Sequence, residues 1–378
     1  MDALCTMTSN LSFLDKDDDD SELLFEIKKN HITMTDQDGK FQVYCAKAQG
    51  TDFDCRIRGY IFRGDKLVYR GFPFTEEMTT NEKTRLASLD LTTLNMSWSY
   101  EGSIVKFLYL DDRWYVTTHR KLDAFKSTWG SKTSFGHLFV QALTTYGYAN
   151  LTEFERVLDP KLRYHFLLIN NEENRVVVRC QLQKEKIYLV LATDEKDVPV
   201  QDVTVDSIPV NPTVKFETID ELVAAVENID PFEKQGIFLF SDDYRRQYRI
   251  LNTLYHDYAS IRNNSQCLIF CYAVNRNDPE KLSKFHLIYP EAKDVADWYE
   301  KRLDVIAREL FVVYKQRYIR HQYVHQSRER HGILTSLDHH YRLTHQATTL
   351  MTVKHKMNTY SPSLLYKIVM KRDQTPIK

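Results

Sequence analysis

The sequence predicts an α+β domain followed by an all-helical C-terminal domain, and three observations predict it. Short apolar runs with alternating polarity, bounded by Gly, Asn and Asp, recur between residues 41 and 251, as in antiparallel strands and hairpins. Beyond Pro290, apolar residues recur instead at three- and four-residue spacing, as on one face of a helix. The 378 residues are 43% apolar, which is enough material for two hydrophobic cores.

The first 25 residues form a polar stretch that includes four consecutive aspartates, residues 17–20. Like charges repel, so we expect a flexible acidic N-terminus. A calcium loop would need spaced carboxylates with a glycine between them, and this run lacks both. The expected domains are then residues 26–290 and residues 291–378.

The α+β pattern along the first domain is built from short strands and a few helices. Turn residues join two hairpins, one through residues 63–66 and one through Asp111 and Asp112. The expected strands cover residues 41–45, 57–62, 67–70, 103–110, 113–118, 164–169, 175–179 (paired with 186–191) and 236–240. The expected helices cover residues 135–143, 151–157, 219–226, 291–325, 334–351 and 362–370.

The net charge of −1 conceals an uneven distribution along the chain. Residues 301–378 carry 15 Lys and Arg against 5 Asp and Glu, whereas residues 1–300 carry 36 against 47. The basic tail is therefore the better candidate for contact with a polyanion, and a solvated helical surface is the plainer alternative.

Composition also limits the compartment and the cofactors. No run of about 18 apolar residues is present and the N-terminus does not resemble a signal peptide, so we expect a cytoplasmic protein with no membrane contact. Six scattered cysteines without a Cys-x-x-Cys pair indicate reduced thiols. His321 and His325 lie four residues apart, but surface histidines explain them better than a metal site, and no metal is expected.

Residues 98–103 read Trp-Ser-Tyr-Glu-Gly-Ser and precede an alternating strand. This segment resembles the Lys-x-Asp/Glu-Gly-Ser signature of the RNA ligase family, most closely its phage-type ATP-dependent branch within the nucleotidyltransferase superfamily. Segments similar to further landmarks follow in the family's order, at residues 55–62, 117–121, 167–178, 235–238 and 249–252, with Tyr255 at a matching offset. The resemblance implies a two-sheet, adenylyltransferase-like fold. It also favours a viral origin, because related ligases are common in phages and large DNA viruses.

The departures from the family pattern concern the reacting groups. Ser99 stands where the nucleophilic lysine is expected, and a hydroxyl cannot replace a neutral amine that attacks ATP. Leu168 and Gln235 stand where the family has carboxylates, which weakens any magnesium site. Arg249 and Leu251 stand where the family has two phosphate-binding lysines. Adenylylation is therefore not expected, although Glu101 keeps the acidic position of the motif.

Three groups of residues remain as candidates. The resemblance places a nucleotide pocket at Arg58, Gly59, Gly102, Ser103, Arg120, Gly236 and Arg249. Lys121 is a substitute nucleophile if Leu110 pairs with Trp114, since Ser103 then faces Lys121, whereas Lys106 lies on the opposite face of its strand from Ser103. Basic residues beside aromatic ones suggest nucleic-acid contacts at Arg245, Arg246, Lys315, Arg317 and Arg320.

These observations leave three hypotheses about function. The first is a catalytically inactive RNA-ligase-like protein that binds nucleic acid, such as single-stranded RNA or tRNA, or has a structural role, and this one needs no cofactor. The second is an active ATP-dependent RNA ligase with a relocated lysine, which would use ATP and Mg²⁺. The third is a virion or assembly protein that uses the scaffold for contacts with protein partners, in the host cytoplasm or the virion.

Overall fold

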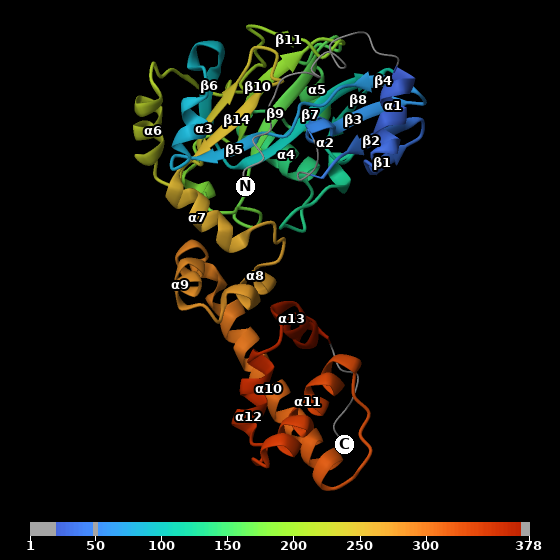
Figure 1. The fold of residues 1–378 in the computed structure, drawn as a ribbon. Helices are drawn as coiled ribbons and strands as arrows, with labels where there is room; N and C mark the ends of the chain where they lie inside the picture. The colour runs from blue at the N-terminus through green and yellow to red at the C-terminus, as the bar shows by residue number, and fades with distance from the viewer. Residues whose placement is uncertain (1–19, 48–51, 372–378) are drawn as a thin grey trace. The chain divides into compact units, whose positions relative to one another are not determined.

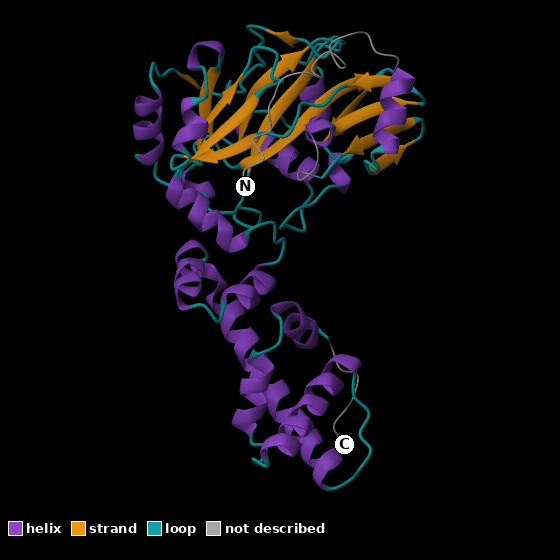
Figure 2. Ribbon diagram, in the orientation of Figure 1, coloured by secondary structure: helices purple, strands orange, loops and turns teal. Residues whose placement is uncertain are grey.

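A computed structural model describes residues 20–47 and 52–371 of the chain. Contacts between residues divide the chain into two units, Met1–His256 and Asp257–Lys378, which are described separately. The first unit holds all the strands of the described residues, and the second is helical (Figure 1; Figure 2). The expected α+β class with a helical C-terminal region is thus confirmed.

The first unit begins with a four-stranded antiparallel sheet in the order β1-β2-β3-β4, which was not expected as a separate sheet. Its strands are β1 (Met34–Asp38), β2 (Phe41–Cys45), β3 (Arg58–Arg63) and β4 (Lys66–Tyr69), so the first hairpin is confirmed. Helix α1 (Asp20–Lys29) packs Leu24 and Ile27 into a core with Tyr44 and Phe62, and α2 (Asp52–Arg56) precedes β3. Residues 1–19 of the predicted flexible N-terminus lie outside the described residues, and residues 20–25 belong to α1.

A five-stranded sheet in the order β11-β10-β9-β7-β8 follows. Its strands are β7 (Gly102–Leu110), β8 (Arg113–Thr117), β9 (Arg163–Ile169), β10 (Ile187–Thr193) and β11 (Pro199–Val200). Asp111 and Asp112 both have positive φ, +51° and +60°, which suits a two-residue hairpin turn. Helices α4 (Phe135–Leu143) and α5 (Leu151–Glu155) cover the face that carries Phe107 and Phe166, as Phe139 and Phe154 pack on these rings.

The register of the second hairpin differs by one residue from the register that was considered for Lys121. Trp114 pairs with Tyr109, and Thr117, the last residue of β8, pairs with Lys106. A slip of one residue reverses which face a side chain occupies. The expectation that Lys121 lies opposite Ser103 is therefore wrong.

The third sheet has the order β12-β6-β13-β14-β5. Its strands are β5 (Glu76–Thr79), β6 (Asn95–Ser99), β12 (Thr213–Val214), β13 (Gly236–Phe240) and β14 (Gln247–Leu251). Helix α6 (Ile219–Glu227), capped by Thr218, packs Leu222 and Val226 on this sheet, and α3 (Lys83–Ala87) adds Leu86. A Cβ on Gly236 would lie 1.9 Å from the Ile250 carbonyl oxygen at a φ of +155°, so this position needs glycine.

The strand expected at residues 175–179 is absent from the described structure, and its supposed partner β10 pairs with β9 instead. The backbone N–H groups of Val176, Val177 and Val178 donate to the Glu101 carboxylate rather than to a neighbouring strand. An apolar run therefore became a loop because a buried carboxylate took its hydrogen-bond donors.

The second unit has seven helices in the described residues, counting α7, which contains the division between the units. They are α7 (Thr253–Arg262), α8 (Leu268–Asn275), α9 (Pro279–Ile288), α10 (Lys293–Tyr314), α11 (Arg328–Thr344), α12 (Leu350–Asn358) and α13 (Pro362–Met370). Tyr272 of α8 and Phe285 of α9 share one core with Tyr299 of α10. For this reason the helical unit begins earlier than the expected residue 291.

Two of the expected helices are shorter than their apolar periodicity suggested. The helix expected at residues 291–325 ends at Tyr314, continues as a π-helical turn at Lys315–Ile319, and gives way to non-helical chain before Ser327. The helix expected at 334–351 is divided, because His345 has a φ of +54° and ends α11. Helix α13 agrees with the expected 362–370. Among the described helices, none has the length and apolar character needed to span a membrane.

Candidate functional site

Ser99, at the position of the family's nucleophile, ends β6 beside the first residues of β13. Its backbone carbonyl oxygen accepts a hydrogen bond from the Gln235 N–H at 2.9 Å, and its hydroxyl donates to Gln235 Oε1 at 3.0 Å. Ser99 also pairs with Gly236 in the sheet register. Ser99 and Gln235 were expected in one centre, and they lie together in the structure.

Gln235 is also hydrogen-bonded to Tyr255 of α7. Its Nε2 donates to the Tyr255 hydroxyl at 2.6 Å, and this hydroxyl donates to Glu101 Oε2 at 3.1 Å. Burial and then the Glu101 charge hold the pKa of Tyr255 well above its usual value. The phenol therefore stays protonated and remains a donor at neutral pH.

Glu101 ends this chain of hydrogen bonds, and both of its oxygens are occupied. One oxygen accepts from the Val176 N–H and from Asn170 Nδ2, the latter at 3.2 Å. The other accepts from the N–H groups of Val177 and Val178 at 2.8 and 3.1 Å, besides Tyr255. A carboxylate that accepts from five donors has a structural role. Glu101 holds the loop at Val176–Val178 and the helix α7 against the sheet.

We call Ser99, Glu101, Gln235 and Tyr255 the sealed network, because all four are buried and satisfy one another. Their exposed fractions are 4%, 3%, 8% and 4%. Among the residues that the structure describes, neither a second carboxylate nor an amine is hydrogen-bonded to these four, so the network does not suit the magnesium and ATP that the family resemblance implies. In the described part of the chain no three His, Cys, Asp or Glu side chains are grouped as metal ligands.

Leu168 and Ser103 lie in the sheet of β9 and β7, whereas Ser99 lies in the sheet of β6 and β13. They pair with each other across β9 and β7, and Leu168 belongs to the core under α4 with Phe107. Since side chains alternate along a strand, Ser103 and Leu168 share the helix-covered face. Gly102 keeps its close approach, because a Cβ there would lie 2.4 Å from the Leu168 carbonyl oxygen.

Lys106 lies on the other face of β7, and a cluster of basic side chains surrounds it. Its Nζ is 4.4 Å from the ring centroid of Tyr69, and the Tyr69 hydroxyl lies 2.9 Å from His165 Nε2. Arg58, at the start of β3, has a buried Nε without a hydrogen-bond partner. Among the described residues no carboxylate forms an ion pair with Lys106 or Arg58. We call Arg58, Lys106, His119 and His165 the cationic cluster.

Burial and mutual repulsion set the ionisation of this cluster. Burial lowers the pKa of Lys106 to about 7, and the Arg58 charge acts in the same direction. Burial lowers the pKa of His165 to about 3, with a further contribution from Lys106. His119 also has a pKa of about 3, from burial and then from Arg58 and Lys106. At neutral pH the histidines are neutral and Lys106 is close to half-protonated.

The remaining pocket candidates have partners of their own. Arg249 Nη1 lies 2.8 Å from Glu77 Oε1, and its charge acts on both Arg58 and Tyr255. Lys121 Nζ is bound 3.2 Å from Asp36 Oδ1 on β1. Arg120 is exposed, and its charge acts on His119. Gly59, at a φ of +76°, lets β3 approach the His119 backbone, where a Cβ would lie 2.7 Å from the carbonyl oxygen.

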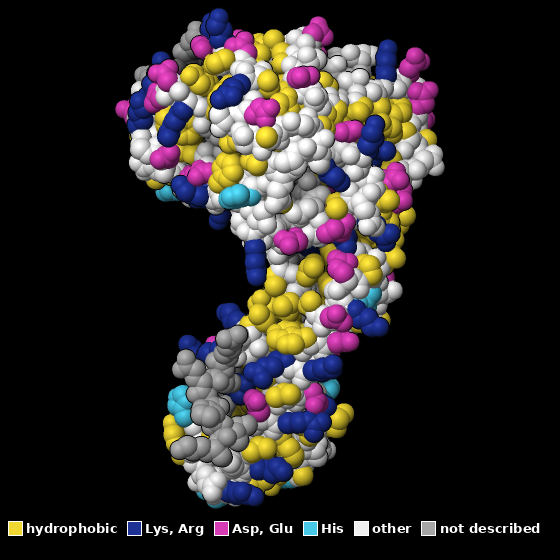
Figure 3. Space-filling view, turned by 180° about the vertical axis from the view of Figure 1, so that it is seen from behind, with side chains coloured by type: hydrophobic (Ala, Val, Ile, Leu, Met, Phe, Trp, Pro, Cys, Tyr) yellow, Lys and Arg dark blue, Asp and Glu magenta, His cyan; other side chains and the backbone are white. Residues whose placement is uncertain are grey.

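Of the basic residues expected in the helical unit, Lys315 and Arg317 lie in the π-helical turn after α10, and Arg320 follows this turn directly. Tyr314 is buried, whereas Ile319 is 63% and Tyr323 is 86% exposed. Lys315 lies over the Phe311 ring, and Arg317 is hydrogen-bonded to His331 Nδ1 at 2.7 Å, while Arg320 is exposed. In the view of Figure 3, Lys and Arg side chains are spread over the helical unit rather than gathered in one patch.

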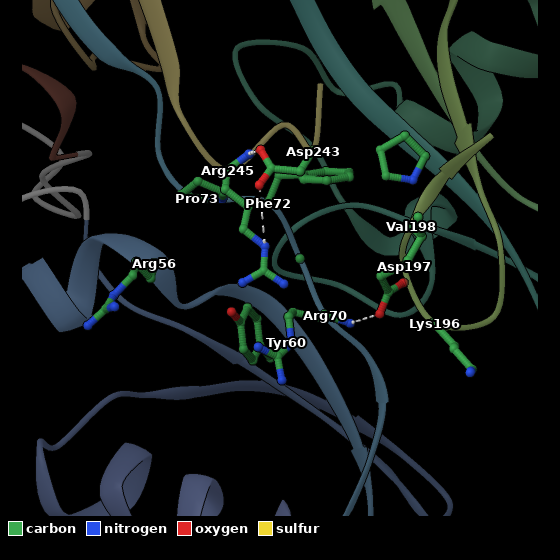
Figure 4. A pocket seen from close by; sticks show the side chains of 12 residues that line it. Arg56, Tyr60, Arg70, Phe72, Pro73, Lys196, Asp197, Val198, Asp243 and Arg245 are labelled. Atoms are coloured by element: carbon green, nitrogen blue, oxygen red, sulfur yellow. Dashed lines mark hydrogen bonds and ion pairs between the residues drawn. The ribbon is translucent and has the colours of Figure 1, made fainter. Parts of the chain in front are cut away.

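A second basic site in the first unit was missed from the sequence, apart from Arg245. It is a hollow of about 140 Å³ where β3, the loop after β4, the β10–β11 turn and the β13–β14 turn meet (Figure 4). We call it the arginine pocket after Arg56, Arg70 and Arg245, which line it with Tyr60. Arg246 is exposed and does not line it. The lining residues come from three separate stretches of the sequence, 56–73, 196–199 and 243–245, so no spacing pattern could have revealed the site.

Comparison with known proteins gives viral relatives. No family model matches the sequence. The chain is 26% identical over 332 residues to the immediate-early protein ICP-46 homolog of Invertebrate iridescent virus 6, covering 78% of this chain and 69% of that protein. It is 27% identical over 289 residues to the homolog of Invertebrate iridescent virus 3, covering 75% of this chain and 63% of that protein. The chain thus spans about two thirds of the length of these relatives.

Two solved structures of ligases are distantly similar to the chain. An archaeal ATP-dependent RNA ligase has a TM-score of 0.41 at 13% identity, covering 70% of this chain and 68% of that one. A putative ATP-dependent DNA ligase from Aquifex aeolicus has the same TM-score and identity, covering 84% and 87%. Such distant likenesses leave the chemistry to be argued from this chain's own side chains.

Proposed function

We propose that this chain is a ligase-type protein of viral origin that does not form an AMP adduct and acts by binding single-stranded nucleic acid, with RNA as the first candidate. The iridovirus relatives support the origin, and the order of motifs supports the ligase type. Each further step rests on a feature of the described residues.

The sealed network is the observation that carries the loss of adenylylation. A nucleophile must be an unprotonated amine with space beside it for the α-phosphate. Here the neutral hydroxyl of Ser99 is hydrogen-bonded to the neutral amide of Gln235, and both side chains are buried. The amide oxygen of Gln235 accepts a hydrogen bond from Ser99, and its amide nitrogen donates one to Tyr255. This position therefore offers no anionic oxygen to a metal ion.

Charge supports the binding of a polyanion. The last 78 residues have a net excess of ten basic residues, and Ile319 and Tyr323 add exposed aliphatic and aromatic surface near Arg320. Cations bind phosphates through counterion release, and exposed aromatic rings stack on unpaired bases. Tyr323 is largely exposed and is the natural stacking residue.

An adenylylation assay tests the first half of the proposal. The purified chain is incubated with α-labelled ATP and Mg²⁺ and then denatured, and no protein-bound label is expected. Lys106→Ala is run in parallel, because Lys106 is an amine that is partly neutral at pH 7 and faces away from the helix-covered side of its sheet. If the wild type becomes labelled and Lys106→Ala does not, Lys106 is a relocated nucleophile. If both proteins become labelled, another lysine is the nucleophile. Either result overturns the proposal that the chain forms no AMP adduct.

Salt-dependent RNA binding tests the second half. Replacing Lys315, Arg317 and Arg320 together by alanine should make the slope of log affinity against log salt shallower by about 2, since each single-strand phosphate contact contributes about 0.7. A charge-matched control replaces the exposed Lys126, Lys132 and Lys161 of the first unit. Equal slopes for the two triple variants would contradict the assigned surface. Defined protein complexes without any RNA retention would favour an assembly role instead.

A further inference from the structure

One face of α10 packs into the core of the helical unit, and another face carries exposed apolar side chains. The core face holds Tyr299, Leu303, Ile306, Leu310 and Tyr314. Away from it lie Trp298, Val305 and Val312, with exposed fractions of 45%, 44% and 51%. Single exposed apolar residues are common on protein surfaces, whereas these three recur every seven residues along one helix. We call these three residues the α10 row.

The spacing of the α10 row fits another helix. A step of seven residues falls about 20° short of two full helical turns, so the row is a narrow stripe that drifts slowly around α10. A second helix follows such a stripe by crossing α10 at a shallow angle, and its side chains then fill the spaces between members of the row. At 1.5 Å per residue the row covers about 21 Å, the length of a helix of about four turns.

An apolar hollow of about 330 Å³ lies at one end of the row. Ile269 of α8, Val295 and Trp298 of α10 and Met370 of α13 line it, together with Asp294. Since Trp298 lines the hollow and begins the row, the two form one continuous apolar surface. Large side chains that enter such hollows commonly supply most of the binding energy of an interface. The hollow therefore gives a docked helix an anchor point.

The stretch 301–315 beside the row is positively charged. It carries two carboxylates, Asp304 and Glu309, and four cations, Lys301, Arg302, Arg308 and Lys315. Each carboxylate is already paired with a cation of another helix, Asp304 with Lys354 of α12 and Glu309 with Arg330 of α11. Arg308 also contacts Asp304, but one carboxylate shared by two cations leaves a positive excess. Acidic side chains beside a partner's apolar stripe would complement this face.

Two other occupants fit the α10 row less well. A second copy of the chain would present the same positive excess, so pairing two rows brings like charges together. A nucleic-acid strand would meet the cations, but it stacks on aromatic rings and gains little from the aliphatic Val305 and Val312. An acidic helix uses both the apolar row and the charge beside it.

We infer that the α10 row and the hollow beside Trp298 form a docking surface for an amphipathic helix of a partner protein, whose apolar stripe is flanked by aspartate and glutamate. The stripe packs along the row, one large apolar side chain enters the hollow, and the carboxylates meet the cations of the stretch 301–315. The inference is independent of RNA binding by Lys315, Arg317 and Arg320, and its variants leave these three residues unchanged.

A designed peptide serves as the probe. It has three heptads with leucine at both apolar positions and glutamate beside them, and a second peptide has lysine in place of glutamate. The acidic peptide should bind the full chain at least about tenfold more tightly than the basic one. Trp298 is exposed, and the other three tryptophans belong to the first unit. Binding should therefore shift tryptophan emission to shorter wavelength, and Trp298→Phe should remove this shift.

Matched variants test the apolar row. Val305→Gln with Val312→Gln removes two of its members without a change of charge, and should weaken binding of the acidic peptide at least about tenfold. The control, Leu343→Gln with Met351→Gln, replaces exposed apolar residues of α11 and α12 and should leave binding unchanged. Circular dichroism of each variant checks that the helices are intact.

A second pair of variants tests the charge. Lys301→Gln with Arg308→Gln should weaken binding of the acidic peptide several-fold and leave the basic peptide no weaker. Lys281→Gln with Lys367→Gln removes the same charge from exposed positions of α9 and α13 and should have no such effect.

Three outcomes would overturn the inference. The first is that the acidic peptide does not bind, or binds Val305→Gln with Val312→Gln as tightly as the wild type. The second is self-association of the wild type in sedimentation that this variant abolishes, which would assign the row to a second copy. The third is loss of RNA binding in this variant while the peptide still binds, which would assign the row to nucleic acid.

Discussion

The sealed network and the arginine pocket are two polar sites in one α+β unit. The first is a closed hydrogen-bond network, and the second is an open hollow lined by cations. In the sealed network each donor meets an acceptor within the protein, and every member is at most 8% exposed. In the arginine pocket, the charges of Arg56, Arg70 and Arg245 act together on Tyr60 beside an open hollow. A closed hydrogen-bond network stabilises the fold, whereas an open hollow lined by polar side chains has room for a ligand.

The largest expected effect comes from opening the sealed network at its centre. Glu101→Ala leaves five donors without their acceptor and should lower the free energy of unfolding by about 3–5 kcal/mol. Urea unfolding followed by tryptophan fluorescence measures this loss. Glu217→Gln, an exposed residue of the same unit, serves as the control. A loss below about 1 kcal/mol would show that the carboxylate does not hold the loop and the helix together.

A smaller loss of stability is expected when Ser99 is replaced by lysine, the residue that the RNA ligase signature has at this position. Ser99→Lys buries an amine among neutral partners and should destabilise the first unit by about 2–4 kcal/mol, without any gain of adenylylation. The double variant Ser99→Lys with Gln235→Glu supplies a counter-charge and should recover part of the loss. Thermal unfolding and the labelled-ATP assay follow the two quantities. A stable Ser99→Lys protein that forms an AMP adduct would mean that the site is open after all.

The smallest expected effect concerns Lys106, whose pKa of about 7 lies far below that of an unfolded lysine. Because the unfolded chain binds more protons between about pH 7 and about pH 10, the stability of the wild type should rise as the pH increases through this window. Lys106→Met keeps the volume and removes the charge, so it should stabilise the unit by about 1–3 kcal/mol at pH 7.

Unfolding of wild type and Lys106→Met at pH 7 and near pH 9.5 measures this linkage. The difference between the two proteins should shrink at the higher pH, where the wild-type lysine is neutral in the folded state. A difference that stays constant would assign the effect to packing alone. A gain of stability on adding phosphate at pH 7 that the wild type shows and Lys106→Met loses would indicate that an anion reaches the cationic cluster.

Much of the fold could be predicted from local patterns. The two hairpins, α4 with its Ser134 cap and α6 with its Thr218 cap follow from turn residues, periodicity and capping, all of which act over a few residues. The extra sheet and the helices between residues 257 and 290 were not predicted, because their short apolar runs gain meaning only from the partners that they pack against. The run 175–179 was mistaken for a strand for the same reason.

The candidate site could be predicted only in part. The motif order correctly brought Ser99, Gln235 and Tyr255 together, but it also assigned Leu168 to a centre from which the alternation of its strand excludes it. Lys121 was placed on a register that is off by one residue. Lys106 was set aside for facing away from Ser103, and that face proved to hold the cationic cluster. Side-chain direction depends on strand register, which residue spacing alone does not determine.

By itself, the sequence determined the two hairpins and the helices α4, α6 and α13, because these depend on residue type and near neighbours. It also determined that Ser99, Leu168 and Gln235 stand where the RNA ligase signature has a lysine and two carboxylates. Only the tertiary structure decided that Glu101, Gln235 and Tyr255 close over Ser99, and that Arg56, Arg70 and Arg245 surround one hollow. Hydrogen bonds and charges act over a few ångströms in space, and only folding brings residues so distant in the chain within that reach.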